Sequence, residues 1–252
     1  VLVKVTDDDT DLEEGMHGAT LNIEIADCYL VLIKRPKKVT KASLLEVALT
    51  IAHEMVHQWF GNSASEKNWC DLWLSEGFAT YFTNYYILKT KGDASFKNAL
   101  EKDRKAIIRF NKIYTHPVVD TSYASLMDLL NTNSYQRGGW VLHMLSKKLG
   151  EEAFLKSVRA YYLKYRLSNA STQDFISVIQ AENPKIEWDN FFNQWLYKPK
   201  IPLLGIQEKL NKNTVQITLT QEQGGVPFVF PLSLKVQLED GTEVITRTCM
   251  IK

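Results

Sequence analysis

Two histidines separated by three residues, with a glutamate beside the first, form the clearest chemical pattern in the sequence. The segment H-E-M-V-H spans residues 53–57. On a helix, positions i and i+4 lie on one face, so His53 and His57 can converge on one Zn²⁺ ion at about 2.0–2.1 Å. Glu54 lies next to the first histidine, where it reaches a zinc-bound water rather than the metal. The pattern therefore predicts a zinc site with Glu54 as general base.

The alternative is a pair of histidines on a solvated helix surface. A chance H-E-x-x-H in a chain of this composition has odds of roughly one in 150. The surface interpretation fits poorly, because apolar residues surround the pair at helical spacing and predict a buried helix. Buried imidazoles beside a carboxylate need partners, and a metal ion supplies one. The apolar positions are Leu44, Val47, Ala48, Ile51, Ala52, Met55, Val56 and Trp59.

Catalytic zinc sites use three protein ligands and leave the fourth position for water or substrate. Glu76 follows His57 by nineteen residues, at the start of the next predicted helix. Alone, it would be read as a favourable charge in a first helical turn. After H-E-x-x-H at this distance, we interpret Glu76 as the third ligand. Asp71 and Thr80 are candidates for orienting a ligand, although structural roles are equally consistent with their positions.

The residues around the three predicted ligands resemble a known family. H-E-M-V-H-Q-W-F-G-N at 53–62 and D-L-W-L-S-E-G-F-A at 71–79 are similar to the motifs of the gluzincin family that contains alanyl aminopeptidase and leukotriene A4 hydrolase. Weaker similarities at 169–175 and 195–202 extend the resemblance over roughly residues 15–252. It implies a zinc peptidase with a thermolysin-like catalytic domain and a peptide substrate.

A further block, residues 134–145, resembles the family pattern Y-x-K-G-x-x-V-L-x-M-L, with Arg137 where lysine is usual. In the family, this tyrosine donates a hydrogen bond to the tetrahedral oxyanion. The resemblance therefore implies the same catalytic role for Tyr135. Without it, Tyr135 would be read as a core tyrosine at a helix start.

One motif departs from the family. The family's G-A-M-E-N strand carries a glutamate that binds the α-amino group of the substrate, and here residues 18–22 read G-A-T-L-N. Leu21 replaces that glutamate and cannot pair with an ammonium group. The positions that match the motif, and that the resemblance makes candidate substrate-binding residues, are Gly18, Ala19 and Asn22.

This departure leaves several functions open. The favoured one is an aminopeptidase whose amine recognition has moved, for example to Glu24 or Asp27. A zinc endopeptidase, or a hydrolase of another small substrate, could use the same site. A catalytically silent relative could serve as a binding or scaffold module, but the presence of ligands, base and tyrosine together favours an enzyme.

Helical periodicity dominates before residue 200, and strand-like alternation dominates after it. We expect a mainly α fold: a thermolysin-like α+β zinc peptidase domain over 1–200, with a short sheet and a helical bundle, then a small, partial β-sandwich over 201–252. Ser43 begins a capping-box pattern for the zinc helix, and Gly61 is its expected stop. The other expected helices cover 75–91, 94–111, 134–149, 151–167, 172–182 and 187–197. The expected strands cover 21–33, 215–219, 228–238 and 244–251.

The bulk composition excludes some classes of protein. A formal net charge of +1 argues against a nucleic-acid binder. No apolar run approaches the ~18 residues of a membrane span, and no signal peptide is visible. Three separated cysteines at positions 28, 70 and 249 form no redox or zinc-ribbon motif. They favour a reducing compartment such as the cytoplasm over an oxidising one and leave the compartment itself open.

Overall fold

The computed structural model describes the backbone of residues 4–5, 18–22, 31–34, 41–188, 190–211, 214–237 and 243–248. Side chains are described for residues 45–188, 190–209, 216–233 and 235. The chain forms two compact units, residues 1–54 and 55–252. Their boundary falls inside α1 (Lys41–His57), which is one continuous helix. The expected division at residue 200 stays a prediction.

The described strands of the first unit form one antiparallel sheet in the order β1-β2-β3. The pairing joins Leu21 of β2 to Val31 of β3, so the chain reverses direction between them. The single strand expected over 21–33 is therefore wrong, because period-2 alternation continues on both sides of a reversal and does not reveal it. Glu24 and Asp27 lie outside the described residues. The strands are β1 (Lys4–Val5), β2 (Gly18–Asn22) and β3 (Val31–Lys34).

Helix α1 begins two residues before the expected start at Ser43 and ends at His57, before the expected stop at Gly61. The side chain of Ser43 lies outside the described side chains, so its capping box stays a prediction. Gly61 lies in the tight turn after the helix, with φ +124°, and its N–H donates to the carbonyl of Ala64 at 2.9 Å.

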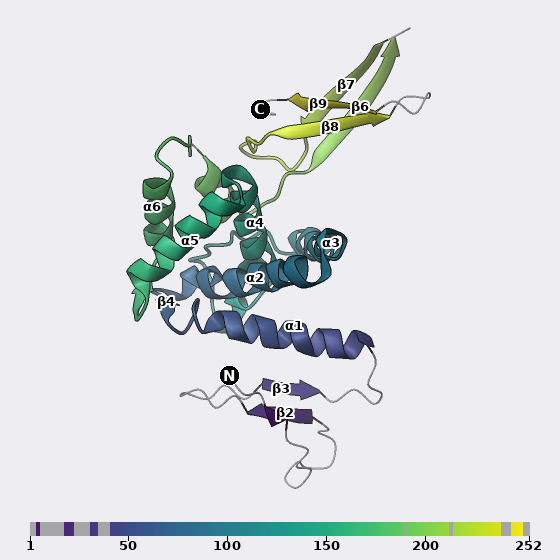
Figure 1. The fold of residues 1–252 in the computed structure, drawn as a ribbon. Helices are drawn as coiled ribbons and strands as arrows, with labels where there is room; N and C mark the ends of the chain where they lie inside the picture. Colours follow the sequence, from purple (N-terminus) through teal and green to yellow (C-terminus); the bar gives the residue numbers. More distant parts are fainter. Residues whose placement is uncertain are drawn as a thin grey trace. The chain divides into compact units, whose positions relative to one another are not determined.

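The second unit is mainly helical. Within it, α2 packs against α3 and α4, and α5 packs against α4 and α6 (Figure 1). Short helical segments lie before α2, between α3 and α4, and after α6. The long helices are α2 (Trp73–Lys91), α3 (Asp93–Asn111), α4 (Gly138–Leu149), α5 (Glu151–Tyr165) and α6 (Thr172–Glu182). The short segments are η1 (Trp69–Asp71), η2 (Leu126–Leu129), η3 (Asn133–Arg137) and η4 (Asn193–Tyr197).

Most expected helix ends agree with the structure to within two residues. The helix expected over 134–149 instead begins with the π-helical segment η3, and α4 starts only at Gly138. The helix expected over 187–197 shrinks to a short stretch that ends in the π-helical η4.

An aromatic core holds the start of α2. Trp73, Phe78, Tyr161 and Phe175 are each at most 1% exposed. The ring of Phe78 lies 5.9 Å from that of Tyr161 and 5.5 Å from that of Phe175, in tilted and edge-to-face contacts. Burying each large apolar side chain contributes about 1.5–3 kcal/mol. The first turns of α2 are thus fixed from within the second unit, and they carry Glu76.

Two antiparallel hairpins follow the helices. The strand β6 pairs with β7, and β8 pairs with β9. A closed β-sandwich stays a prediction. Strand β4 (Ala64–Glu66) pairs in parallel with β5 (Ser168–Ala170), joining the turn after α1 to the start of α6. The hairpin strands are β6 (Leu204–Asn211), β7 (Thr214–Gln221), β8 (Leu232–Gln237) and β9 (Glu243–Thr248).

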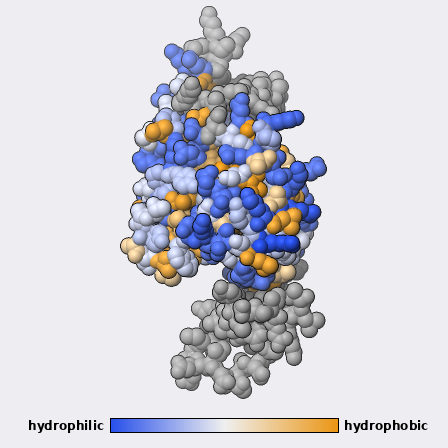
Figure 2. Space-filling view, turned by 90° about the vertical axis from the view of Figure 1, so that its left-hand side faces the viewer, coloured by the Kyte–Doolittle hydropathy of each residue, from blue (hydrophilic) through white to orange (hydrophobic). Residues whose placement is uncertain are grey.

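The face shown in Figure 2 is mostly hydrophilic, with hydrophobic residues scattered among charged ones. Singly scattered apolar side chains are normal on a protein surface. Among the described residues, no helix has both the length and the apolar character needed to cross a membrane.

Candidate metal centre

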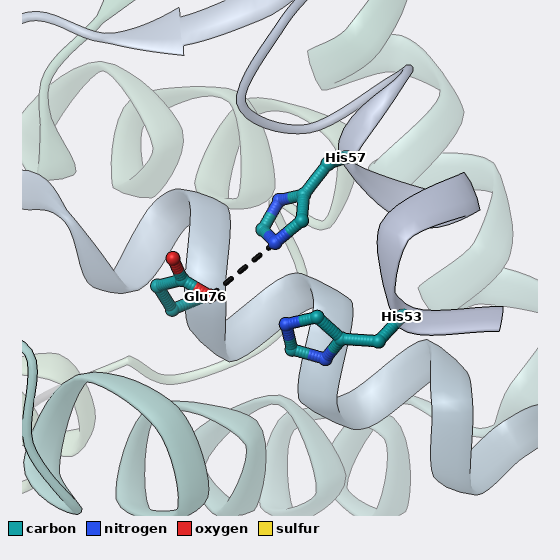
Figure 3. Close-up of side chains that lie close together, drawn as sticks. All are labelled: His53, His57 and Glu76. Carbon is teal, nitrogen blue, oxygen red and sulfur yellow. Dashed lines mark ion pairs between the residues drawn. The ribbon is translucent and has the colours of Figure 1, made fainter. Parts of the chain in front are cut away.

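The structure brings the three predicted ligands together. One ligand atom from each of His53, His57 and Glu76 lies within 4.8 Å of the other two. The Nε2 atom of His57 is 3.3 Å from Oε2 of Glu76. Figure 3 shows both imidazole rings and the carboxylate directed toward a common space, with the histidines one turn apart on α1 and the glutamate on α2.

These distances suit a zinc ion. Tetrahedral zinc with ligands at about 2.0–2.1 Å holds neighbouring ligand atoms about 3.3–3.4 Å apart. The separation of 3.3 Å between His57 and Glu76 already has this value. The other separations are at most 4.8 Å, so they exceed it by no more than about 1.5 Å. Two imidazole nitrogens and one carboxylate oxygen match the donor set of a catalytic site with one open position.

The ring of His57 is oriented by groups on its far side. Its Nδ1 lies 3.1 Å from the carbonyl oxygen of Phe60 and 3.1 Å from Oγ of Ser75. A carbonyl oxygen can only accept, so Nδ1 carries the hydrogen and donates it. In the neutral imidazole, which is the form that binds a metal, the lone pair then belongs to Nε2, the atom that faces Glu76. Such hydrogen bonds fix the tautomer and the orientation of a metal-binding histidine.

Gly61 makes room for this arrangement. A Cβ atom at this position would lie 2.5 Å from Oγ of Ser75 and 3.1 Å from Nδ1 of His57. Its φ of +124° also lies in the region that favours glycine. Both the space and the backbone conformation therefore require glycine beside the candidate ligand.

Asp71 and Thr80 have structural partners. Asp71 is 3% exposed, and its Oδ1 accepts hydrogen bonds from N (2.9 Å) and Oγ1 (2.7 Å) of Thr172, at the start of α6. Its Oδ2 accepts from Nδ2 of Asn68 at 3.0 Å. The side chain of Thr80 lies against Gly139 of α4. Asp71 thus connects η1, which directly precedes α2, to the start of α6. Neither Asp71 nor Thr80 has a described contact with the three candidate ligands.

Tyr135 lies in η3, which packs against α2. The backbones approach closely there, since a Cβ at Gly77 would lie 2.9 Å from the carbonyl carbon of Gly138. Gly77 directly follows Glu76, and Gly138 follows Tyr135 by three residues. The side chain of Tyr135 is partly buried. Its catalytic role stays a prediction.

The remaining predicted site residues are not tested by side-chain geometry. Glu54 is partly buried on α1, directly after His53. Gly18, Ala19 and Asn22 lie on β2, the strand expected from the G-A-M-E-N resemblance, but their side chains lie outside the described part.

Two neighbours of the cluster were not predicted from the sequence. Ser75 orients His57, and its place directly before Glu76 in the D-L-W-L-S-E block was the available signal. Glu66 of β4 is the second: burial raises the pKa of its carboxyl, the negative charge of Glu76 adds to the shift, and His57 opposes it. No periodicity in the sequence indicated that Glu66 faces this region.

The fold and the cluster together define a mainly helical domain of the H-E-x-x-H metallopeptidase type. Residues 15–195 match the model of the peptidase family M1 domain. The chain belongs to peptidase family M1.

Individual relatives agree with this assignment. The chain is 34% identical over 173 residues to aminopeptidase M1-D of Oryza sativa subsp. japonica, covering 65% of this chain and 19% of the rice protein. It is 34% identical over 181 residues to the alanine/arginine aminopeptidase of Saccharomyces cerevisiae, covering 70% and 21%. The chain thus spans about a fifth of the length of these relatives.

A solved structure supports the fold. Aminopeptidase A of Legionella pneumophila, in complex with aspartic acid, superposes with a TM-score of 0.63 at 20% identity. The superposition covers 87% of this chain and 25% of the Legionella chain. At this identity, the similarity concerns the fold.

Proposed function

We propose that the chain is the catalytic part of a zinc-dependent aminopeptidase with a thermolysin-like domain, in which His53, His57 and Glu76 hold the metal. The observation that carries the proposal is the convergence of their three ligand atoms within 4.8 Å in a member of peptidase family M1. A zinc ion bound there supplies a Lewis acid that lowers the pKa of water toward ~7 and polarises the scissile carbonyl.

The protein's own groups then perform the proton transfer and stabilise charge. Glu54 takes the proton of the attacking water and passes it to the leaving amine. Tyr135 donates a hydrogen bond to the oxyanion of the tetrahedral intermediate. The hydrogen bond between Nδ1 of His57 and the Phe60 carbonyl holds that ligand in position during both steps.

The names of the relatives support removal of N-terminal residues rather than internal cleavage. Leu21 favours the second candidate, a zinc endopeptidase, because an aliphatic side chain gives no counter-charge to a substrate ammonium. If the aminopeptidase proposal holds, another acidic group must bind that ammonium. Glu24 and Asp27 are the candidates from the sequence.

The two functions differ in their need for a free amine. We would measure hydrolysis of alanyl-p-nitroanilide, its N-acetyl derivative and an internally quenched blocked peptide by the zinc-loaded chain. An aminopeptidase cleaves the first substrate, and its kcat/KM on the acetylated one is lower by at least ~10-fold. A loss of this size follows from the removal of one hydrogen bond to a charged group. Faster cleavage of the blocked peptide would support the endopeptidase. No hydrolysis of any substrate by a zinc-loaded, folded chain would leave the silent relative as the better account.

A further inference from the structure

The segment that carries Tyr135 has an unusual backbone. In η3, the N–H of Arg137 donates to the carbonyl of Thr132 at 2.9 Å, an i to i−5 bond. The N–H of Gly138 donates to the carbonyl of Asn133, again five residues earlier. Such π-helical turns are rare and occur frequently at functional sites. A wider turn at this point rotates Tyr135 relative to where a continuous α-helix would place it.

Three of the five side chains of η3 are buried and bonded to other parts of the chain. Asn133, Ser134 and Arg137 are 1%, 2% and 3% exposed. Nδ2 of Asn133 donates to the carbonyl of His116 at 2.7 Å, and Oγ of Ser134 donates to the carbonyl of Leu129 at 2.6 Å. The segment is thus held on both sides of Tyr135.

Arg137 makes the most extensive of these contacts. Its guanidinium donates to the carbonyls of His116 (3.1 Å), Pro199 (3.1 Å), Lys198 (2.7 Å) and Lys200 (3.0 Å). Burial lowers the pKa of this guanidinium to about 10. All four acceptors are neutral, although burying a charge is costly and usually requires a counter-charge. The planar guanidinium of arginine carries several N–H donors in a fixed geometry, so one side chain can bond to all four carbonyls at once.

We propose that Arg137 is a positioning residue for Tyr135. It binds the His116 carbonyl and the 198–200 backbone at once, and so fixes the end of the π turn that aims the phenol at the substrate carbonyl. The proposal rests on the proposed function, because Tyr135 must act on the oxyanion for its position to matter. Residues 198–200, which precede the C-terminal strands, therefore help to fix the position of Tyr135 through Arg137.

A purely structural explanation is that Arg137 only ties the C-terminal strands to the helical body. Gln194 offers a matched control. It is 3% exposed, its Nε2 donates to the carbonyl of Val229 at 2.7 Å, and its Oε1 accepts from the N–H of Val229 at 2.8 Å. It ties the same region of the chain to the helices without a described hydrogen bond to η3.

The experiment uses the zinc-loaded chain with R137K, R137M and Q194L, each alone and combined with Y135F. Methionine removes every donor, whereas lysine keeps the charge but cannot span both acceptor groups with its single nitrogen. Since misplacement by about 1 Å costs ~10²-fold, we expect R137M to lower kcat by ~10–10²-fold and R137K by ~3–10-fold, with KM within about twofold. In the Y135F background both changes should alter kcat by less than about twofold, because coupled residues are non-additive.

A second readout does not depend on activity. Hydrogen exchange of residues 129–140 in the metal-free chain should accelerate in R137K and R137M but not in Q194L. If R137M fails to fold, R137K alone decides. Three results would overturn the proposal: equal kcat losses with and without Tyr135, a similar kcat loss in Q194L, or R137K activity within twofold of the original chain. An inactive but zinc-loaded original chain would instead overturn the proposed function, and the exchange data would still report on Arg137.

Discussion

The two halves of the candidate site are held in different ways. On the metal half, His57 is oriented by Phe60 and Ser75, all within eighteen residues along the chain. On the tyrosine half, Arg137 bonds to carbonyls up to 63 residues away. The hydrogen bonds that orient His57 are therefore local, whereas the position of Glu76 on α2 also depends on the aromatic contacts of Phe78 with Tyr161 and Phe175. The tyrosine half requires the helical body to be folded through residue 200, so the two halves should respond differently to substitution.

The largest expected effect removes the chemistry of the metal half while keeping its geometry. Glu54→Gln should lower kcat by ~10²–10⁴-fold, because an amide cannot accept the proton of the attacking water. The zinc content should stay at the level of the original chain, since Glu54 is not one of the three clustered residues. Elemental analysis and kcat on the same sample check this. Near-normal turnover would show that another group is the base.

A smaller effect is expected from the group behind His57. Ser75→Ala removes a hydrogen-bond partner of Nδ1, and loss of such a support weakens metal affinity by ~10–10²-fold. Competition titration with a zinc chelator measures it.

Ser65→Ala is the matched control for Ser75→Ala. Oγ of Ser65 donates to the carbonyl of Gly61 at 2.7 Å, in the same turn, without a described bond to His57. Equal zinc affinities for the two variants would mean that Ser75 serves the turn and not the ligand.

The smallest effect is expected from Asp103, which lies outside both halves of the site, and it should change only the stability of the fold. Burial raises the pKa of Asp103 to about 6, against an opposing hydrogen bond from Nδ2 of Asn84 at 2.6 Å. Because the folded pKa exceeds the unfolded value of 3.8, this carboxyl contributes stability below about pH 4 that is lost as pH rises through 6. Asp103→Asn should therefore stabilise the chain by about 1–3 kcal/mol at pH 7 but by only about 0.6 kcal/mol at pH 4.

Urea unfolding of Asp103→Asn at the two pH values tests this expectation, with kcat unchanged. Glu101→Gln, an exposed change on the same helix, should lack the stabilisation at pH 7. A stabilisation that did not depend on pH would rule out the carboxyl as its source.

The sequence predicted the parts of the molecule that depend on local patterns. The H-E-x-x-H spacing predicted the convergence of His53 and His57, and the caps and periodicity predicted α2, α3 and α6 to within two residues. The π turn was missed, because residues 134–149 have the apolar spacing of one continuous helix. The contacts of Arg137 could not be predicted from the sequence, since its acceptors are backbone carbonyls that any sequence supplies.

The strand expected over 21–33 failed for a related reason. Residue alternation cannot show a chain reversal, and Leu21 pairs with Val31 across one. The proposed amine recognition depends on this same region, so the sequence leaves its acidic group as a choice between Glu24 and Asp27.

The proposed activity depends on the binding of one zinc ion by His53, His57 and Glu76 together. Zinc X-ray absorption spectroscopy of the purified chain, paired with metal content, tests it most directly. We predict one zinc per chain with two imidazole nitrogens and carboxylate or water oxygens in the first shell, and loss of the metal in Glu76→Gln. Stoichiometric zinc that persists unchanged in both His53→Ala and Glu76→Gln, or no zinc uptake by the folded chain, would contradict it.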